Sequence, residues 1–290
     1  MQHADQHQFE ARFGRIAAAA AIAAALLPIV STIVLSAVLG ARGEGLRGVL
    51  TAFERQPTGV VATSVVQALG TFLIAVVLYF LYRAARYRIP GTPAVALPVA
   101  LVAPMLVGLS DVGLKLALID AGRDFVSSGD RSEGRAEDLV REGATATAQY
   151  AGSAARAVLG TAFVLISLYA MRAGLLSRFM AYVGIIIGAL FVFAVLLGGV
   201  PPFILLFWLP AVALLFLDRW PGGRGPAWAA GEAVPWPGAA EQRRALERKR
   251  AEEGDQVVSA AGGPNGDGPA SADPDTPRTS SPRKRKRKRR

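Results

Sequence analysis

The chain alternates long apolar stretches with short polar segments over most of its length. Six stretches are nearly continuous runs of Ala, Leu, Ile, Val and Phe, and they cover residues 14–39, 59–82, 94–118, 149–171, 179–198 and 201–217. A helix needs about 20 such residues to cross a hydrocarbon layer of about 30 Å. The pattern therefore predicts an all-α protein, a polytopic bundle of about six transmembrane helices that follows a short segment, residues 1–13.

The first apolar stretch is preceded by arginines, as in a secretory signal peptide. It runs for some 25 residues with Pro28 in its middle, whereas a signal peptide has a core of about 7–15 residues and a cleavage site. We therefore expect a retained helix, with cleavage after an alanine as the alternative. The fifth and sixth stretches are separated only by Gly198–Pro202, which predicts a tight helical hairpin because glycine and proline interrupt helices.

Basic residues in the loops indicate the orientation, because Lys and Arg near helix ends are retained in the cytoplasm. The N-terminal segment and the loops 83–93 and 172–178 together hold seven arginines, and the loops on the opposite side also hold seven. The first set is concentrated in shorter connections, and Arg219 and Arg224 follow the last stretch directly. The sequence thus predicts a multi-pass protein of the bacterial plasma (inner) membrane with both termini in the cytoplasm.

Composition narrows the possible chemistry. Hydrophobic residues make up 52% of the 290 residues, and the absence of cysteine excludes disulfides, thiolate catalysis and Cys-ligated metal sites. No nucleophile–base pair or metal-ligating cluster is visible in the pattern. We expect no catalytic residue, no metal and no cofactor, and an enzyme is the least favoured class.

The chain changes character after Leu217. A Pro/Gly/Trp-rich stretch is followed by a predicted short helix at 241–253 and by a linker at 254–282 that is too polar to fold alone. The tail 218–290 is therefore expected to be largely disordered. Its last eight residues are all basic: Arg283, Lys284, Arg285, Lys286, Arg287, Lys288, Arg289 and Arg290. Such a block attracts anionic lipid or nucleic acid, or it acts only as a topology anchor.

Charged side chains inside the third and fourth stretches are the main candidates for chemistry. Asp111 and Lys115 are four residues apart, so they share a helix face and can pair, and Arg156 lies at a similar depth in the next stretch. Intramembrane charges mark ion or substrate pathways, but a neutral pair also serves as a strut between helices. Both interpretations are open at this point.

Two further features concern packing and the outer loop. Gly184 and Gly188 form a small-xxx-small pair, which allows close approach of two backbones within the bundle or between protomers of a homo-oligomer. The loop between the third and fourth stretches contains a predicted helix at Ser132–Glu142, and Ser132 is a suitable N-cap.

The segment Met171–Phe179, a short basic turn between helices, is followed by a glycine-containing span. Together with the layout of six spans before a tail, it resembles uncharacterised bacterial multi-span membrane proteins that are known only as domains of unknown function. The resemblance implies a membrane helix bundle and transfers no activity and no site residue. The expected function is a structural or interaction component of the membrane. The alternative is a small transporter or channel-like protein that uses Asp111 and Lys115.

Overall fold

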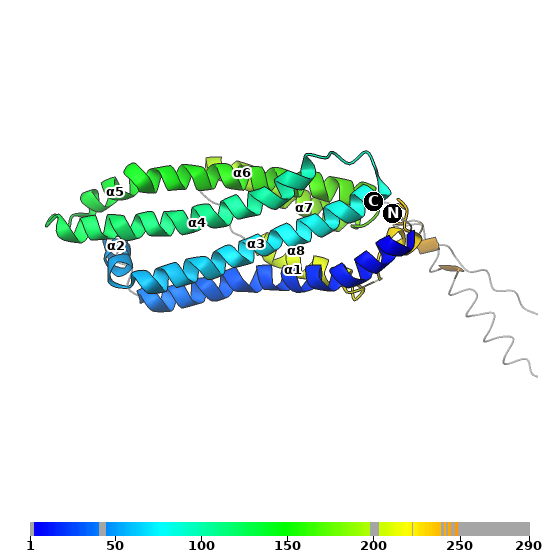
Figure 1. Ribbon diagram of the computed structural model, residues 1–290, viewed down its shortest axis with the longest axis horizontal. Coiled ribbons are helices and arrows are strands. Elements are labelled where there is room, and N and C mark those ends of the chain that lie inside the picture. Colours follow the sequence, from blue (N-terminus) through cyan, green and yellow to red (C-terminus); the bar gives the residue numbers. More distant parts are fainter. Residues whose placement is uncertain are drawn as a thin grey trace, which may run out of the picture. The chain divides into compact units, whose positions relative to one another are not determined.

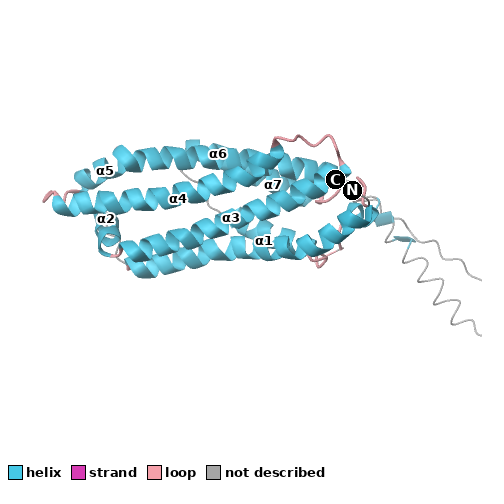
Figure 2. Cartoon of the chain, viewed as in Figure 1, coloured by secondary structure: helices cyan, strands magenta, loops and turns pink. Residues whose placement is uncertain are grey.

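A computed structural model describes residues 3–40, 45–197, 203–221 and 223–238, and a few single positions between 241 and 248. The chain divides into two compact units, Met1–Trp236 and Pro237–Arg290. All regular elements described belong to the first unit, and all are helices (Figure 2). They are α1 His3–Leu39, α2 Gly45–Arg55, α3 Pro57–Arg88, α4 Ala96–Ser127, α5 Glu133–Arg141, α6 Gly143–Arg172, α7 Arg178–Leu197, α8 Phe203–Phe216 and α9 Pro226–Ala230.

Four of these helices are long and apolar enough to cross a membrane. They are α1, in which the qualifying part is Gln8–Ala37, together with α3, α4 and α6 over their whole lengths. Their 30 to 32 residues correspond to about 45–48 Å at a rise of 1.5 Å per residue, which exceeds the thickness of the hydrocarbon layer. The predicted all-α architecture is thus confirmed over the described residues, and four of its helices are suited to cross a membrane. The apolar α7 and α8 are shorter, at 20 and 14 residues.

The long helices extend beyond the apolar stretches that predicted them. α3 continues from the expected end at 82 to Arg88, and α4 continues from 118 to Ser127. The helix α1 begins at His3 instead of near Gly14. Hydropathy reports only the apolar part of a helix, whereas Arg, Ala and Leu continue the same hydrogen-bond ladder into polar surroundings.

The helices of the first unit form a closed series of neighbours. α1 packs on α3, α3 on α4, α4 on α6, α6 on α7, α7 on α8, and α8 returns to α1. The start of α1 and the end of α3 lie at one end of the bundle, here called the amino-terminal end, whereas α2 and α5 lie at the other (Figure 1). Helices from the two ends of the sequence thus meet in one bundle.

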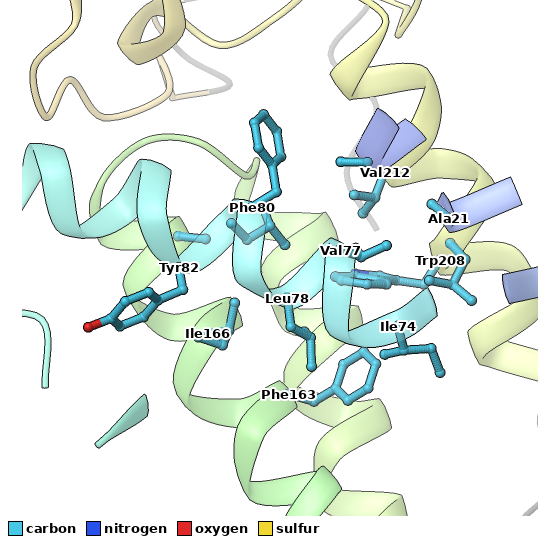
Figure 3. Close-up of a cluster of buried hydrophobic side chains, with 14 of the residues drawn as sticks. Ala21, Ile74, Val77, Leu78, Phe80, Tyr82, Phe163, Ile166, Trp208 and Val212 are labelled. Atoms are coloured by element: carbon cyan, nitrogen blue, oxygen red, sulfur yellow. The ribbon is translucent and has the colours of Figure 1, made fainter. Parts of the chain in front are cut away.

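The bundle interior combines a small-residue helix with large aromatic side chains. α1 contributes buried alanines, among them Ala17 and Ala21, which allow neighbouring helices to come close. Phe80, Phe163 and Trp208 fill the space between α3, α6 and α8 and are fully buried (Figure 3). Because lipid is as apolar as these side chains, close packing and not burial from water holds the helices together.

The far end of the bundle carries a second packed region. The sequence interpretation treated residues 40–58 as a loop, but α2 is amphipathic and buries Leu50 and Phe53 against α4. The predicted helix after Ser132 is confirmed as α5, and the Ser132 hydroxyl accepts a hydrogen bond from the backbone N–H of Arg135 at 3.2 Å. Ala136 of α5 packs into the same cluster as Leu50. The outer loop is therefore joined to α2 and α4.

The compact unit extends past the predicted boundary at residue 217. It ends at Trp236, and the three tryptophans after α8, Trp220, Trp228 and Trp236, pack against the main hydrophobic cluster. The tryptophan-rich stretch was assigned to the tail because glycine and proline surround it, yet its aromatic rings have large apolar surfaces to bury. The predicted linker 254–282 and the basic block 283–290 lie outside the described residues, as does much of the predicted helix 241–253.

Candidate functional site

Asp111 of α4 forms an ion pair with Arg156 of α6. An Arg156 guanidinium nitrogen donates a hydrogen bond to Asp111 Oδ1 between these neighbouring helices. The Asp111 side chain is 13% exposed and the Arg156 side chain 33%. Gly152 provides the space, because a β-carbon there would lie 3.1 Å from an Arg156 nitrogen. The two charges compensate each other across a helix–helix interface.

Lys115 does not form the expected pair with Asp111. No ion pair joins these two described residues, and the Lys115 ammonium lies over the ring of Phe53 in α2, 5.4 Å from its centroid. The i, i+4 spacing permits pairing within one helix. Asp111 instead binds the Arg156 guanidinium of α6, and Lys115 makes a cation–π contact with Phe53. The three predicted residues thus lie near one another, but Asp111 pairs with Arg156 and not with Lys115.

Gly184 and Gly188 face α6 within the bundle. Gly184 lies against the Ser167 side chain, and a β-carbon on Gly188 would lie 2.5 Å from the Gly160 carbonyl oxygen. The small-residue pair therefore serves the α6–α7 interface inside one chain. Gly160 was not among the predicted packing residues, although it is the glycine of α6 that completes this contact.

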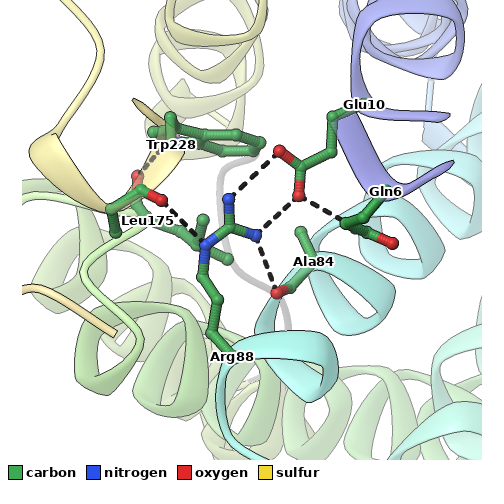
Figure 4. A network of polar contacts seen from close by, with 7 residues as sticks. Gln6, Glu10, Ala84, Arg88, Leu175 and Trp228 are labelled. Carbon is green, nitrogen blue, oxygen red and sulfur yellow. Dashed lines mark hydrogen bonds and ion pairs between the residues drawn. The ribbon is translucent and has the colours of Figure 1, made fainter. Parts of the chain in front are cut away.

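The amino-terminal end contains a buried ion pair that the sequence interpretation missed. Arg88 at the end of α3 donates to both carboxylate oxygens of Glu10 in α1, at 2.6 and 3.1 Å (Figure 4). Their side chains are 0% and 4% exposed. Gln6, one turn before Glu10, donates to the same carboxylate at 2.9 Å. Arg88 had been counted only as a basic loop residue that indicates orientation.

The remaining donors of Arg88 connect this pair to the segment after α8. Arg88 Nε donates to the Ala227 carbonyl at 3.0 Å, and its guanidinium lies 5.3 Å from the Trp228 ring centroid. The Trp228 indole N–H in turn donates to the Leu175 carbonyl in the α6–α7 turn, at 3.0 Å (Figure 4). A buried charge is tolerated only when it is paired and hydrogen-bonded, and four hydrogen bonds, two of them to Glu10, hold the Arg88 guanidinium.

Arg224 also contacts the ring of Trp228 and supports the same segment. Its guanidinium is 5.3 Å from the Trp228 ring centroid and donates to the carbonyls of Leu215 and Phe216 at the end of α8. Burial lowers the pKa of this guanidinium, and the charges of Asp218 and Glu10 oppose that effect. Arginine stays charged at neutral pH because its ordinary pKa is so high. The end of α8 is thereby capped by a cation, as the helix dipole favours.

Comparison with known proteins gives no relative. No family model, no curated protein and no solved structure matches this chain. Among the described residues, no three His, Asp or Glu side chains come close enough together to hold a metal ion. The described groups with a bearing on function are therefore the ion pairs and the helices that carry them.

Proposed function

We propose that this chain is a non-enzymatic structural or interaction component of the bacterial inner membrane. The observation that supports this proposal best is the Asp111–Arg156 ion pair, which joins α4 to α6. A strut between helices needs two opposite charges in direct contact, whereas a pathway needs a charge that faces water or substrate. The second ion pair, Glu10–Arg88, likewise joins two helices and leaves almost none of either charge exposed.

The position of the ion pair along α6 also supports the strut. Gly160 meets α7 at Gly188 and Val192, and Arg156 lies one turn, about 6 Å, further towards the start of α6. The helix α7 ends at Leu197, about 7.5 Å beyond Val192, so it reaches a similar level. With 20 residues α7 is about 30 Å long, which matches one hydrocarbon layer. On this basis Arg156 lies near a membrane boundary, where a charge costs little.

We propose six crossings, with α7 and α8 as an antiparallel hairpin. The described part of α8 covers only about 21 Å, which is shorter than the hydrocarbon layer. A hairpin that enters and leaves by the same side would give four crossings instead of six. In both cases the number is even, so the tail lies on the same side as the start of α1. The concentration of arginines at the amino-terminal end of the bundle favours the cytoplasmic side for the start of α1 and for the tail.

The proposed partner of the tail is anionic lipid of the inner leaflet. A basic residue near such a surface gains about 1 kcal/mol, and the block 283–290 holds eight of them. Substitution of these eight residues with glutamine should weaken binding to vesicles that contain phosphatidylglycerol, and added salt should reduce the difference. Retained vesicle binding would refute the lipid proposal, and binding to a random DNA duplex that the substitution abolishes would assign the block to nucleic acid.

Reporter fusions test the topology. A reporter that is active only in the cytoplasm and one that is active only outside are fused after Arg290 and inserted at positions 130 and 200. We expect Arg290 to report the cytoplasm and positions 130 and 200 to report the outside. A cytoplasmic signal at position 200 would reduce the number of crossings to four, and an outside signal at Arg290 would overturn the orientation and the tail proposal together.

The alternative is a small transporter that uses Asp111 and Lys115, and the absence of a direct ion pair on Lys115 among the described residues supports it as a second candidate. The chain contains no cysteine, so Asp111→Cys introduces a single thiol. A membrane-impermeant maleimide added from each side then reports access. Labelling from both sides would support a transporter, whereas no labelling or labelling from one side only supports the strut near a boundary.

A further inference from the structure

A cavity of about 290 Å³ lies at the amino-terminal end of the bundle, and none of the four residues of the two ion pairs lines it. Its walls come mainly from one face of α3, with one residue from α1 and one from the start of α4. The lining residues are Gln6, Tyr79, Tyr82, Arg83, Arg86, Tyr87 and Leu97. The volume is just below the range of about 300–1,000 Å³ of pockets for small organic ligands. It is suited to a headgroup-sized ligand.

The α3 residues of this wall repeat at helical spacing. Tyr79, Tyr82, Arg83, Arg86 and Tyr87 recur every three or four residues, so they form one stripe on the last turns of the helix. Tyrosine and arginine in this position are typical of the boundary between hydrocarbon and headgroups. The stripe lies in the two and a half turns before the end of α3, at the end of the bundle where arginines are concentrated.

Each arginine of the stripe is held by a tyrosine hydroxyl one turn earlier. Arg83 Nη1 donates to the Tyr79 hydroxyl at 3.1 Å, and Arg86 Nη1 donates to the Tyr82 hydroxyl at 2.5 Å. The ring of Phe9 also supports the Arg83 guanidinium, which lies 4.1 Å from the ring centroid. Each hydroxyl oxygen accepts from a cation, so its own O–H group can donate to another acceptor.

The acidic group that the described hydrogen bonds join to the cavity wall is paired with Arg88. Gln6 connects the cavity wall to Glu10, and the Glu10 carboxylate is occupied by Arg88. Arg86 is exposed, and among the described residues it bonds to Tyr82 and to no carboxylate. Two guanidiniums and two oriented phenolic hydroxyls therefore surround a space with aromatic walls.

We propose that this cavity binds the phosphate of an anionic, phosphate-bearing ligand whose attached carbon chain lies along the tyrosine rings. The planar guanidinium of arginine can donate two parallel hydrogen bonds to a pair of phosphate oxygens, and the hydroxyls of Tyr79 and Tyr82 add neutral donors. The boundary position favours a phospholipid headgroup as the source of the phosphate. Basic pockets between helices on the cytoplasmic side of membranes bind such headgroups. This assignment rests on the proposed crossing of the membrane by α1, α3 and α4.

The test measures phosphatidylglycerol retained by the full chain in detergent, at about 0.5 M salt, where the Debye length falls to about 4 Å and contacts of the basic block 283–290 are screened. We expect about one retained lipid per chain by native mass spectrometry, and little phosphatidylcholine. The double variant Arg83→Gln/Arg86→Gln should lose retention at least about tenfold, because two charge-assisted contacts disappear. Tyr82→Phe removes one hydroxyl alone and should reduce retention severalfold.

The matched control is Arg172→Gln. Arg172 ends α6 at the same end of the bundle and is exposed, and its guanidinium lies 5.5 Å from the Tyr169 ring centroid, as that of Arg86 lies 5.8 Å from the Tyr82 ring. The control should retain as much phosphatidylglycerol as the unmodified chain. Equal retention by the double variant, by Tyr82→Phe and by the control would overturn the proposal, and so would equal retention of phosphatidylcholine.

A competition experiment identifies the source of the phosphate. Glycerol 1-phosphate and inorganic phosphate are added to the lipid-loaded protein. Unchanged lipid retention assigns the cavity to a membrane lipid, whereas displacement assigns it to a soluble phosphate compound. The reporter fusions test the membrane crossing separately, so failure of the proposed topology and failure of phosphate binding give different results.

Discussion

Gly160 of α6 and Gly188 of α7 lie against each other's backbone carbonyl oxygens. A side chain on either residue would occupy the position of the other helix's carbonyl group, since a β-carbon on Gly188 would lie 2.5 Å from the Gly160 oxygen. Backbone contact of this kind permits weak Cα–H···O=C hydrogen bonds across the interface. The two helix backbones are consequently in direct contact at these glycines.

We expect Gly188→Ala to destabilise the folded protein by about 1–3 kcal/mol, as overpacking of close interfaces does. The measurement is thermal unfolding of the detergent-solubilised protein. Gly113→Ala in α4 is the matched control, because a β-carbon there meets no atom within 4 Å. The control should be neutral or stabilising by up to about 1 kcal/mol, since alanine favours helix. A similar loss in both variants would contradict the role of Gly188.

Glu10→Gln should be strongly destabilising, because it leaves the Arg88 charge buried without a counterion. Removal of one partner of a buried ion pair costs about 3–5 kcal/mol. Thermal or denaturant unfolding of the purified protein measures the effect. Arg123→Gln breaks the exposed pair with Asp120 and should change stability by no more than about 0.5 kcal/mol. Comparable effects of these two substitutions would refute the structural role of Glu10.

The effects of Asp111→Asn and Arg156→Gln on the free energy of unfolding should be coupled. Each single substitution leaves a charge without its partner and should cost about 1.5–3 kcal/mol, the usual contribution of a hydrogen bond to a charged group. The double variant should cost less than the sum, with a coupling energy of at least about 0.5 kcal/mol in a double-mutant cycle. Lys115→Gln should cost only about 0.5–1 kcal/mol, because it removes a cation–π contact. Additive effects of the first two substitutions would show that their contact does not stabilise the protein.

Glu133→Gln should loosen α2 at the far end of the bundle. The Glu133 carboxylate accepts from the backbone N–H of Leu46 in the first turn of α2 at 2.8 Å and pairs with Arg47 at 2.9 Å. This acidic group compensates the positive end of the α2 dipole from another helix. Hydrogen exchange of the α2 amides should become severalfold faster. Glu137→Gln is the control. Within the described part of the chain Glu137 pairs only with Arg141 of the same helix, at 3.7 Å, so unchanged exchange of the α2 amides is expected.

The long helices were predictable because lipid imposes a simple rule on sequence. A spanning helix must be apolar over about 20 residues, so α3, α4 and α6 are visible in the sequence as long apolar stretches. The helix α2 had a signal that was not used: Leu46, Val49, Leu50 and Phe53 recur at the spacing of one helix face. The arginines of this segment indicate orientation, and the amphipathic pattern beside them predicts the helix.

The Glu10–Arg88 pair had no comparable signal. Its members lie 78 residues apart, and each has a simpler explanation in the sequence: Glu10 as a polar residue before the first span, and Arg88 as a basic residue after the second. Only the antiparallel packing of α1 on α3 brings them together. Asp111 and Arg156 were found because a charge within an apolar stretch is conspicuous, although the pairing partner was set by the neighbouring helix.

The contact between α1 and α8 has a consequence for biosynthesis. The buried alanines of α1 are completely covered only when α8 packs on that helix. Phe203, the first residue of α8, is synthesised 200 residues after His3, the first residue of α1. At about 5–20 residues per second, the ribosome needs about 10–40 s to reach Phe203 after α1 begins. During that interval the alanine surface that α8 will cover faces lipid, and in a truncated chain that lacks α8 it continues to do so.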